Sequence, residues 1–318
     1  QVSTFSGHIQ FVSIGRGSMQ ARRGMQHMTH LTPTCWPALP PFSAEAEVCR
    51  EAHASRASST FRVLTWNVWF DPLLGAERQC ALIREVLLAA PDVACFQEVV
   101  PEFARTLRES ETVCSLYDVS PFAVGNYGDL QLVRRACNAK FELQRMPTNM
   151  GRSAVISSWT SLIPGLHVAS AHLESLKSPS TRRKQLAVLA ERLAACPTSV
   201  ICGDFNFDST KTWGDWKRGK PACPPEELEN KVLLEVLPEF VDVWPLLRPD
   251  EEGITFDGKE NPICVQDSDE QMRYDRILAS AGPLQPVAIQ MLGREDINDW
   301  GARPSDHFGL CGDFEVRR

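Results

Sequence analysis

Short apolar runs alternate with amphipathic segments through most of the chain, and this pattern predicts a layered domain of strands and helices. Residues 61–67 and 93–96 read as buried strands, and apolar positions at helical spacing over 77–90 predict a helix between them. The same order recurs as a helix over 180–195 and a strand over 199–202. Further strands are expected at 130–134, 152–158, 166–172, 272–279, 285–291 and 308–316. The recurring order favours an α/β domain over residues 61–318.

Residues 1–60 show neither strand nor helix periodicity, and proline, glycine, serine and threonine are scattered through them. We expect a disordered or variable N-terminal segment here. It is poor in acidic residues and carries some arginine and serine, which also fits a targeting segment. A variable tail or mistranslated upstream sequence is the simpler interpretation, and the start at Gln1 hides the true N-terminus.

Composition narrows the class of protein. The chain of 318 residues is 43% hydrophobic and 23% charged, and no apolar run reaches the roughly 20 residues that a membrane-spanning helix needs, so we expect no membrane partner. Its 11 cysteines are irregularly spaced, which fits neither a disulfide framework nor a structural zinc site, and favours a reducing compartment.

The net charge of −7 also limits the partners. Residues 1–44 hold three arginines and no acid, so the remainder carries 30 basic and 40 acidic residues. A body this acidic does not bind polyphosphates through its overall field, and phosphate contact has to come from local cations or bound metal. The charge therefore disfavours a non-specific nucleic-acid binder but permits a metal-dependent phosphate enzyme.

Polar side chains cluster at the ends of the predicted strands. Carboxylates and amides are the oxygen ligands that magnesium or manganese prefers. The clusters contain Asn67 in Thr65-Trp-Asn-Val68, Glu98 in Cys95-Phe-Gln-Glu-Val99, His172 to Ser175 in Ala171-His-Leu-Glu-Ser175, Asp204 and Asn206 in Gly203-Asp-Phe-Asn206, and Asp306 with His307 in Ser305-Asp-His-Phe-Gly309. Each cluster alone has an ordinary explanation, such as a turn cap or a solvated strand end. Five such clusters, each at the end of a predicted strand, together favour a site that binds a metal ion and a phosphate.

In this order, the motifs resemble the signature of the endonuclease/exonuclease/phosphatase superfamily, over about residues 61–318. Within it, the segments Phe240 to Trp244, Met272 to Ile277 and Arg303 to Gly309 resemble the tyrosyl-DNA phosphodiesterases, and Asn149 to Arg152 is also similar. The resemblance implies a four-layer α-β-β-α sandwich of two packed, mostly antiparallel sheets flanked by helices, with the site at one end.

The resemblance also implies roles for individual residues. Glu98 corresponds to the principal Mg²⁺ ligand, with Asn67 and Asp306 near the metal, and Mn²⁺ is an alternative. Asp204 corresponds to the residue that orients and deprotonates water, Asn206 to one that holds the phosphate, and His307 to the donor toward the phosphoryl oxygens. Asp275 corresponds to the carboxylate that fixes the histidine tautomer, although an ion pair with Arg273 or Arg276 would also explain it.

Substrate contacts are the next set that the resemblance assigns. His172, Ser175 and Arg152 correspond to phosphate-binding groups, and Phe256 stands where an aromatic residue would flank the DNA path. The chain departs from the pattern at Phe207-Asp208-Ser209, where a cation is missing. The long loop over 208–230, with its lysines and two tryptophans, offers replacement cations and stacking faces, or is merely a solvated insertion.

These observations predict a magnesium-dependent phosphodiesterase that hydrolyses a 5′-phosphotyrosyl-DNA bond in DNA repair and leaves a 5′-phosphate. The alternatives are a related enzyme acting on abasic DNA, RNA, a phosphoinositide or a sphingolipid, and an inactive scaffold. The resemblance further implies a monomeric protein of the nucleus, with organelle import left open.

Overall fold

Residues 38–317 are described by the computed structural model, apart from 58, 123–124, 197, 217–223 and 265–268. Every element below belongs to the unit Trp36–Arg318. The expectation of disorder at residues 1–37 lies outside the described residues.

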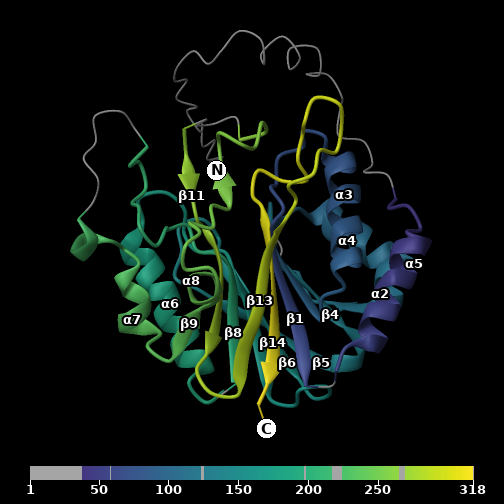
Figure 1. The fold of residues 1–318 in the computed structure, drawn as a ribbon, viewed down its shortest axis with the longest axis horizontal. Coiled ribbons are helices and arrows are strands. Elements are labelled where there is room, and N and C mark those ends of the chain that lie inside the picture. Colours follow the sequence, from purple (N-terminus) through teal and green to yellow (C-terminus); the bar gives the residue numbers. More distant parts are fainter. Residues whose placement is uncertain are drawn as a thin grey trace, which may run out of the picture. The chain divides into compact units, whose positions relative to one another are not determined.

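Two six-stranded sheets form the centre of the fold (Figure 1). The first has the order β13-β14-β1-β2-β4-β3, with β13 Leu284–Leu292, β14 Gly309–Val316, β1 Thr60–Asn67, β2 Val93–Val99, β4 Gly128–Arg134 and β3 Tyr117–Val119. The second has the order β5-β6-β7-β8-β12-β9, with β5 Ala139–Arg145, β6 Ser153–Trp159, β7 Leu166–Ala171, β8 Thr198–Asp204, β12 Asp275–Ser280 and β9 Phe240–Asp242. A separate small hairpin pairs β10 Phe256–Asp257 with β11 Gln271–Met272.

Each sheet contains one parallel pair, β1 with β2 and β7 with β8, and its other pairs are antiparallel. Successive side chains of a strand point to opposite faces of its sheet. The central strands are buried on both faces because one face meets the other sheet and the other face meets the helices. In β1, Phe61 and Val63 enter the core between the sheets, whereas Leu64 and Trp66 enter the core under the helices. This double burial explains why the central strands appear in the sequence as apolar runs.

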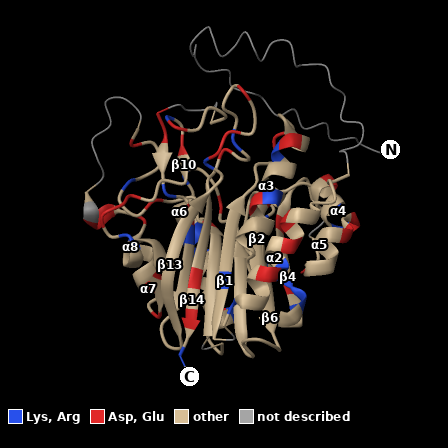
Figure 2. Ribbon diagram, turned by 45° about the vertical axis from the view of Figure 1, so that its right-hand side comes forward, with Lys and Arg blue, Asp and Glu red and all other residues tan. Residues whose placement is uncertain are grey.

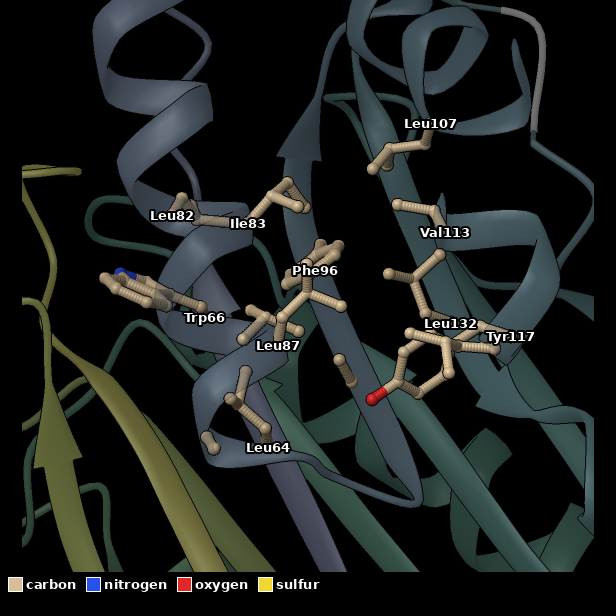
Figure 3. Packing of buried hydrophobic residues seen from close by; sticks show 14 of the residues in the cluster. Leu64, Trp66, Leu82, Ile83, Leu87, Phe96, Leu107, Val113, Tyr117 and Leu132 are labelled. Carbon is tan, nitrogen blue, oxygen red and sulfur yellow. The ribbon is translucent and has the colours of Figure 1, made fainter. Parts of the chain in front are cut away.

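Helices cover the outer face of each sheet. The first sheet packs against α2 Ser43–Ser55, α3 Gly75–Ala89, α4 Pro101–Glu109 and α5 Glu111–Leu116, and the second packs against α6 Pro179–Leu193 and α7 Lys231–Val236. In the first of these cores, Leu82, Ile83 and Leu87 of α3 meet Phe96 of β2 (Figure 3). The short helix α8 Val243–Leu247 packs beside β12 and β13.

Charged residues lie mostly on the helices and loops, and few lie on the central strands (Figure 2). The predicted four-layer α-β-β-α sandwich is confirmed.

Helix α2 is a difference from the sequence expectation, because it lies within residues 1–60, where no regular element was predicted. It buries only Ala46, Cys49 and His53, and the Cys49 Sγ lies 3.3 Å from the hydroxyl oxygen of Tyr117. Such a small and partly polar buried face does not produce a strong hydrophobic period. The folded body therefore begins before the predicted boundary at residue 61.

Candidate active site

The predicted polar clusters meet at one edge of the two sheets. Because β1 and β2 are parallel and β14 runs antiparallel to β1, the ends of β1 and β2 lie at the same edge as the start of β14. In the second sheet, the register places Asp275 directly opposite Asp204. A hydrogen bond of 3.0 Å from Asn67 Nδ2 to Asp204 Oδ2 joins the two sheets at this edge.

Glu98 projects from an irregularity in β2. The register between β2 and β4 shifts between Phe96 and Val99, and Glu98 adopts φ 60°, in the left-handed region that glycine favours. Such backbone strain is characteristic of functional sites. The shift turns the carboxylate so that Oε2 accepts a hydrogen bond from the Phe70 amide at 3.2 Å and Oε1 lies 3.9 Å from His172 Nε2. Burial, and then the charge of Asp306, raise the pKa of Glu98 to about 7.

Asn67, the last residue of β1, and Asp306, in the loop before β14, lie beside Glu98. The Asn67 side chain is fixed at both ends, because Oδ1 accepts from the Trp69 amide at 3.0 Å while Nδ2 donates to Asp204. Ser305 Oγ donates to the Asn67 carbonyl oxygen at 2.6 Å and lies 3.3 Å from Asp306 Oδ1. Burial raises the pKa of Asp306 to about 6. The raised pKa values of these two neighbouring carboxyls mean that the cost of burying their charges exceeds what the surrounding cations and hydrogen bonds offset.

This donor set suits a hard divalent cation. Among the described residues, no three His, Cys, Asp or Glu side chains are close enough together to form a ready metal cage. Mg²⁺ does not require one, because it keeps several waters and commonly takes only one or two carboxylates from the protein. The oxygen-rich, under-compensated group of Glu98, Asp306 and Asn67 therefore fits Mg²⁺ or Mn²⁺.

Asp204 contacts more of the site's polar residues than its neighbours at this edge do, through Asn67, His172, His307 and Asn206. Oδ2 lies 3.4 Å from His172 Nε2 and 3.9 Å from His307 Nε2, and Oδ1 accepts from the Asn206 amide at 2.9 Å. Burial disfavours its charged form, but the two histidines and the Asn67 amide outweigh that effect and lower the pKa. Asp204 is thus ionised at neutral pH, as a general base must be.

His307 is paired with a buried carboxylate. Its Nδ1 lies 2.7 Å from Asp275 Oδ2, while Arg273 and Arg276 both bind Asp242 instead. The alternative ion pair between Asp275 and these arginines is therefore wrong. Burial opposes a charged imidazole, but Asp275 outweighs it and raises the pKa of His307 well above its ordinary value. A protonated His307 has Nε2–H free to donate into the site.

His172, Arg152 and Ser175 form a second chain of contacts. Arg152 Nη1 lies 2.9 Å from His172 Nδ1, and Nη2 donates to Ser175 Oγ at 2.8 Å. Because a guanidinium only donates, His172 Nδ1 is the acceptor and Nε2 carries the proton. Burial, followed by the charge of Arg152, lowers the pKa of His172 to about 3, so this imidazole is neutral. The Ser175 hydroxyl keeps its own proton for a further acceptor.

Two residues of the predicted clusters have other partners. Glu174 points away from the site and accepts from Thr148 Oγ1 and the Asn149 amide, both at 2.7 Å. Asn206, at φ 55°, donates from Nδ2 to the Leu173 carbonyl at 3.0 Å. Its side chain thus braces the loop after β7 and offers the site its amide oxygen and one remaining N–H.

Aromatic residues line the site on two sides. Phe256 contacts His307 edge to face, with ring centroids 5.1 Å apart. On the other side, Tyr127 stacks on Phe70 at 4.8 Å, lies 6.5 Å from the His172 ring and carries the Arg152 guanidinium over its face at 5.3 Å. Sequence reasoning missed Tyr127 and Phe70. The available signal was an aromatic residue between turn residues just before a strand, in Gly125-Asn-Tyr-Gly128.

The loop over 208–230 supplies no described cation to this edge. Asp208, at the position of the missing cation, is buried and accepts from the backbone amides of Arg273 and Thr210. Lys211 binds Glu252 at 3.2 Å, and Trp213 contacts Trp216 edge to face. Lys217, Arg218 and Lys220 lie outside the described residues.

Comparison with known proteins identifies the family of the chain. The sequence profile of the Endonuclease/Exonuclease/phosphatase family matches residues 64–307. Tyrosyl-DNA phosphodiesterase 2 of Xenopus laevis is 27% identical over 271 residues, which cover 81% of this chain and 67% of that protein. The Gallus gallus protein of the same name is 28% identical over 274 residues, covering 81% and 68%.

Solved structures with a similar fold include proteins of the same name. The structure of D. rerio TDP2 complexed with single strand DNA product matches with a TM-score of 0.67 and 26% identity, over 81% of this chain and 100% of that one. The human Nocturnin catalytic domain with bound sulfate has a TM-score of 0.55 at 19% identity, covering 81% and 94%, and so shows a shared fold alone.

Proposed function

The chain belongs to the Endonuclease/Exonuclease/phosphatase family, and within it we propose that the chain is a Mg²⁺-dependent phosphodiesterase that hydrolyses a 5′-phosphotyrosyl-DNA bond, leaving a 5′-phosphate. The observation that carries this proposal is the convergence of Glu98, Asp204 and His307 at one sheet edge. The similarity to tyrosyl-DNA phosphodiesterase 2 supports the choice of substrate.

Glu98, Asn67 and Asp306 would hold the cation. When bound, Mg²⁺ neutralises non-bridging phosphate oxygens and so favours attack at phosphorus. The raised pKa values of Glu98 and Asp306, which are partly buried, are consistent with that assignment, since a divalent cation would stabilise their charged forms.

Asp204 would accept a proton from water, and His307 would donate to the phosphoryl group. Ionised Asp204 orients a water and accepts its proton as the oxygen attacks phosphorus in line with the leaving group. Protonated His307, held through Nδ1 by Asp275, donates from Nε2 to an oxygen of the phosphoryl group where negative charge grows. The Asp275 contact fixes which ring nitrogen faces the substrate.

The remaining polar groups would bind the phosphate and orient the substrate. Neutral His172 and the Ser175 hydroxyl lie on the Arg152 side of the site, and Asn206 adds its free amide atoms. The stacked pair of Tyr127 and Phe70 offers an aromatic surface on this side, and Phe256 offers another beside His307. Aromatic faces on both sides suit a substrate that carries bases and an aromatic leaving group.

A panel of phosphodiesters tests the proposal. With Mg²⁺, the purified chain should convert a 5′-tyrosyl oligonucleotide to the 5′-phosphate product, and chelator should stop the reaction. Hydrolysis of abasic duplex DNA, RNA, a phosphoinositide or a sphingolipid in its place would assign another activity of the same family. Failure to cleave any member would favour an inactive scaffold.

The cellular setting is proposed on the same basis. We propose that the protein works in the nucleus on DNA ends, as a monomer. Among the described residues, no helix is both long enough and apolar enough to cross a membrane. Imaging of the full chain and of a chain without residues 1–37, which keeps helix α2, tests whether the N-terminal residues direct the protein elsewhere.

A further inference from the structure

Arg78 is a buried cation that the catalytic proposal does not use. It lies in the first turn of α3, and only 3% of its surface is exposed. Among the described residues it forms no direct salt bridge, although a buried guanidinium normally takes a carboxylate partner. Such a costly arrangement calls for a specific explanation.

All five N–H donors of Arg78 bind backbone carbonyls. Nε donates to Leu73 at 2.8 Å, and Nη2 donates to Trp69 at 3.3 Å and Asp71 at 2.6 Å. Nη1 donates to Val68 at 3.1 Å and to Pro304 at 3.2 Å. One side chain therefore joins the loop after β1 to the loop before β14.

The same two loops contact or contain the expected metal ligands. In the loop after β1, the Trp69 amide binds Asn67 Oδ1 and the Phe70 amide binds Glu98 Oε2. The other loop leads from Pro304 to Asp306. Arg78 thus binds carbonyl groups of the loop after β1, and backbone amides of the same loop bind Asn67 and Glu98.

We propose that Arg78 is a positioning residue that sets the geometry of the Mg²⁺ site. The inference rests on the proposed function, because it assumes that Asn67, Glu98 and Asp306 hold the cation. The planar fork of a guanidinium explains the choice of residue, since lysine has three donors on one atom and cannot reach five carbonyls arranged around a plane.

Arg78→Lys is the informative substitution, because it keeps the charge and removes the fork. We expect the Kd for Mg²⁺, measured by titration calorimetry without substrate, to rise about tenfold, the effect typical of residues that orient metal ligands. The Mg²⁺-induced rise in the unfolding midpoint should shrink in parallel. Both readouts are independent of turnover.

Arg182→Lys is the control for the loss of a buried guanidinium; unlike Arg78, Arg182 also pairs with a carboxylate, that of Glu229, at 2.6 Å. Arg182 is 2% exposed and also donates to loop carbonyls, those of Glu174 at 2.7 Å and Leu176 at 2.8 Å, but on the loop after β7. Its replacement should leave the Kd for Mg²⁺ within about twofold, since Arg182 binds neither the loop after β1 nor the loop before β14.

Each outcome decides the inference. Equal Mg²⁺ affinity in the wild-type chain and Arg78→Lys would overturn it, as would an equal loss in both lysine variants. A chain that no longer folds with Lys at position 78 would assign Arg78 to general stability and also overturn it. Absence of Mg²⁺ binding in the wild-type chain would overturn both the inference and the assignment of Asn67, Glu98 and Asp306 as metal ligands. Unchanged Mg²⁺ binding in Arg78→Lys together with normal 5′-tyrosyl cleavage would overturn the inference alone and leave the proposed function intact.

Discussion

Three carboxyls, those of the buried Asp129 and of the partly buried Glu98 and Asp306, have raised pKa values chiefly because burial penalises their charged forms. Asp129 lies in β4 and accepts a hydrogen bond from Ser170 Oγ at 3.0 Å. Sequence motifs located Glu98 and Asp306, because their neighbours form recognisable patterns. They did not locate Asp129, Tyr127 or Phe70, since a single acid or aromatic beside a strand has no distinctive spacing.

Replacing Glu98 with Gln should stabilise the metal-free chain in a pH-dependent manner. The folded-state pKa of Glu98 is raised from 4.5 to about 7, so its contribution to stability is full below pH 4.5 and is lost as the pH rises through 7. In chelator, Glu98→Gln should therefore gain about 3 kcal/mol relative to wild type between pH 4.5 and pH 8, because the folded-state pKa lies about 2.5 above 4.5 and each pH unit corresponds to roughly 1.4 kcal/mol. Urea unfolding at several pH values measures this difference.

Two comparisons complete that experiment. Glu226→Gln changes an exposed carboxyl and should show little pH-dependent difference from wild type. Saturating Mg²⁺ should remove the advantage of Glu98→Gln, because the cation stabilises the charged carboxylate. A difference that is flat with pH in chelator would contradict the assigned environment of Glu98.

Asp275→Asn should lower turnover by about 100-fold, because the amide no longer stabilises a protonated His307 or selects the ring nitrogen that faces the substrate. Steady-state rates on the 5′-tyrosyl oligonucleotide measure it. Asp242→Asn is the control, since Asp242 binds the two arginines that flank this part of β12 and does not contact His307. Equal losses of activity in the two folded variants would assign the Asp275 effect to sheet stability.

At the scale of elements, the ends of β7 and β8 depend on Gly203. Its φ is 139°, and a Cβ there would lie 2.0 Å from the Ala171 carbonyl oxygen. The close approach brings the start of the His172 segment next to Asp204, whose carbonyl accepts from the Leu173 amide at 2.9 Å. A glycine just before the Asp-x-Asn motif is thus a packing requirement of the site.

Gly203→Ala should destabilise the chain by about 2–3 kcal/mol more than Gly282→Ala, because overpacking adds to the backbone strain. Gly282 is a matched control, with a similar φ of 131° and no atom within 4 Å of the added Cβ. The free energies of unfolding in urea give the comparison. Equal values for the two variants would show that strands β7 and β8 separate at little cost.

Element prediction from the sequence succeeded where burial is strong and failed where it is weak. The two long helices α3 and α6 were predicted because each buries several apolar side chains at helical spacing, and the central strands because each buries an apolar run. Strand β5 was missed because its burial is only partial along its whole length, and α2 because its buried face is small. Elements at the rim of a domain bury too little apolar surface to leave a clear period.

At the scale of the whole molecule, two sheets supply complementary halves of one site. The first contributes Asn67, Glu98 and the residues before β14, and the second contributes His172, Asp204 and Asp275. The sequence alone indicated that these segments belong together only through the order of family motifs, because pairing between distant strands leaves no local signal. The core between the sheets holds the halves in place.

Hydrolysis of a 5′-tyrosyl oligonucleotide in ¹⁸O-labelled water with Mg²⁺ tests the central claim most directly. If the converging side chains direct water onto phosphorus, mass spectrometry should find one ¹⁸O atom in the 5′-phosphate and none in the released tyrosine. Label in the tyrosine product, or no release of tyrosine with Mg²⁺ present, would contradict the account.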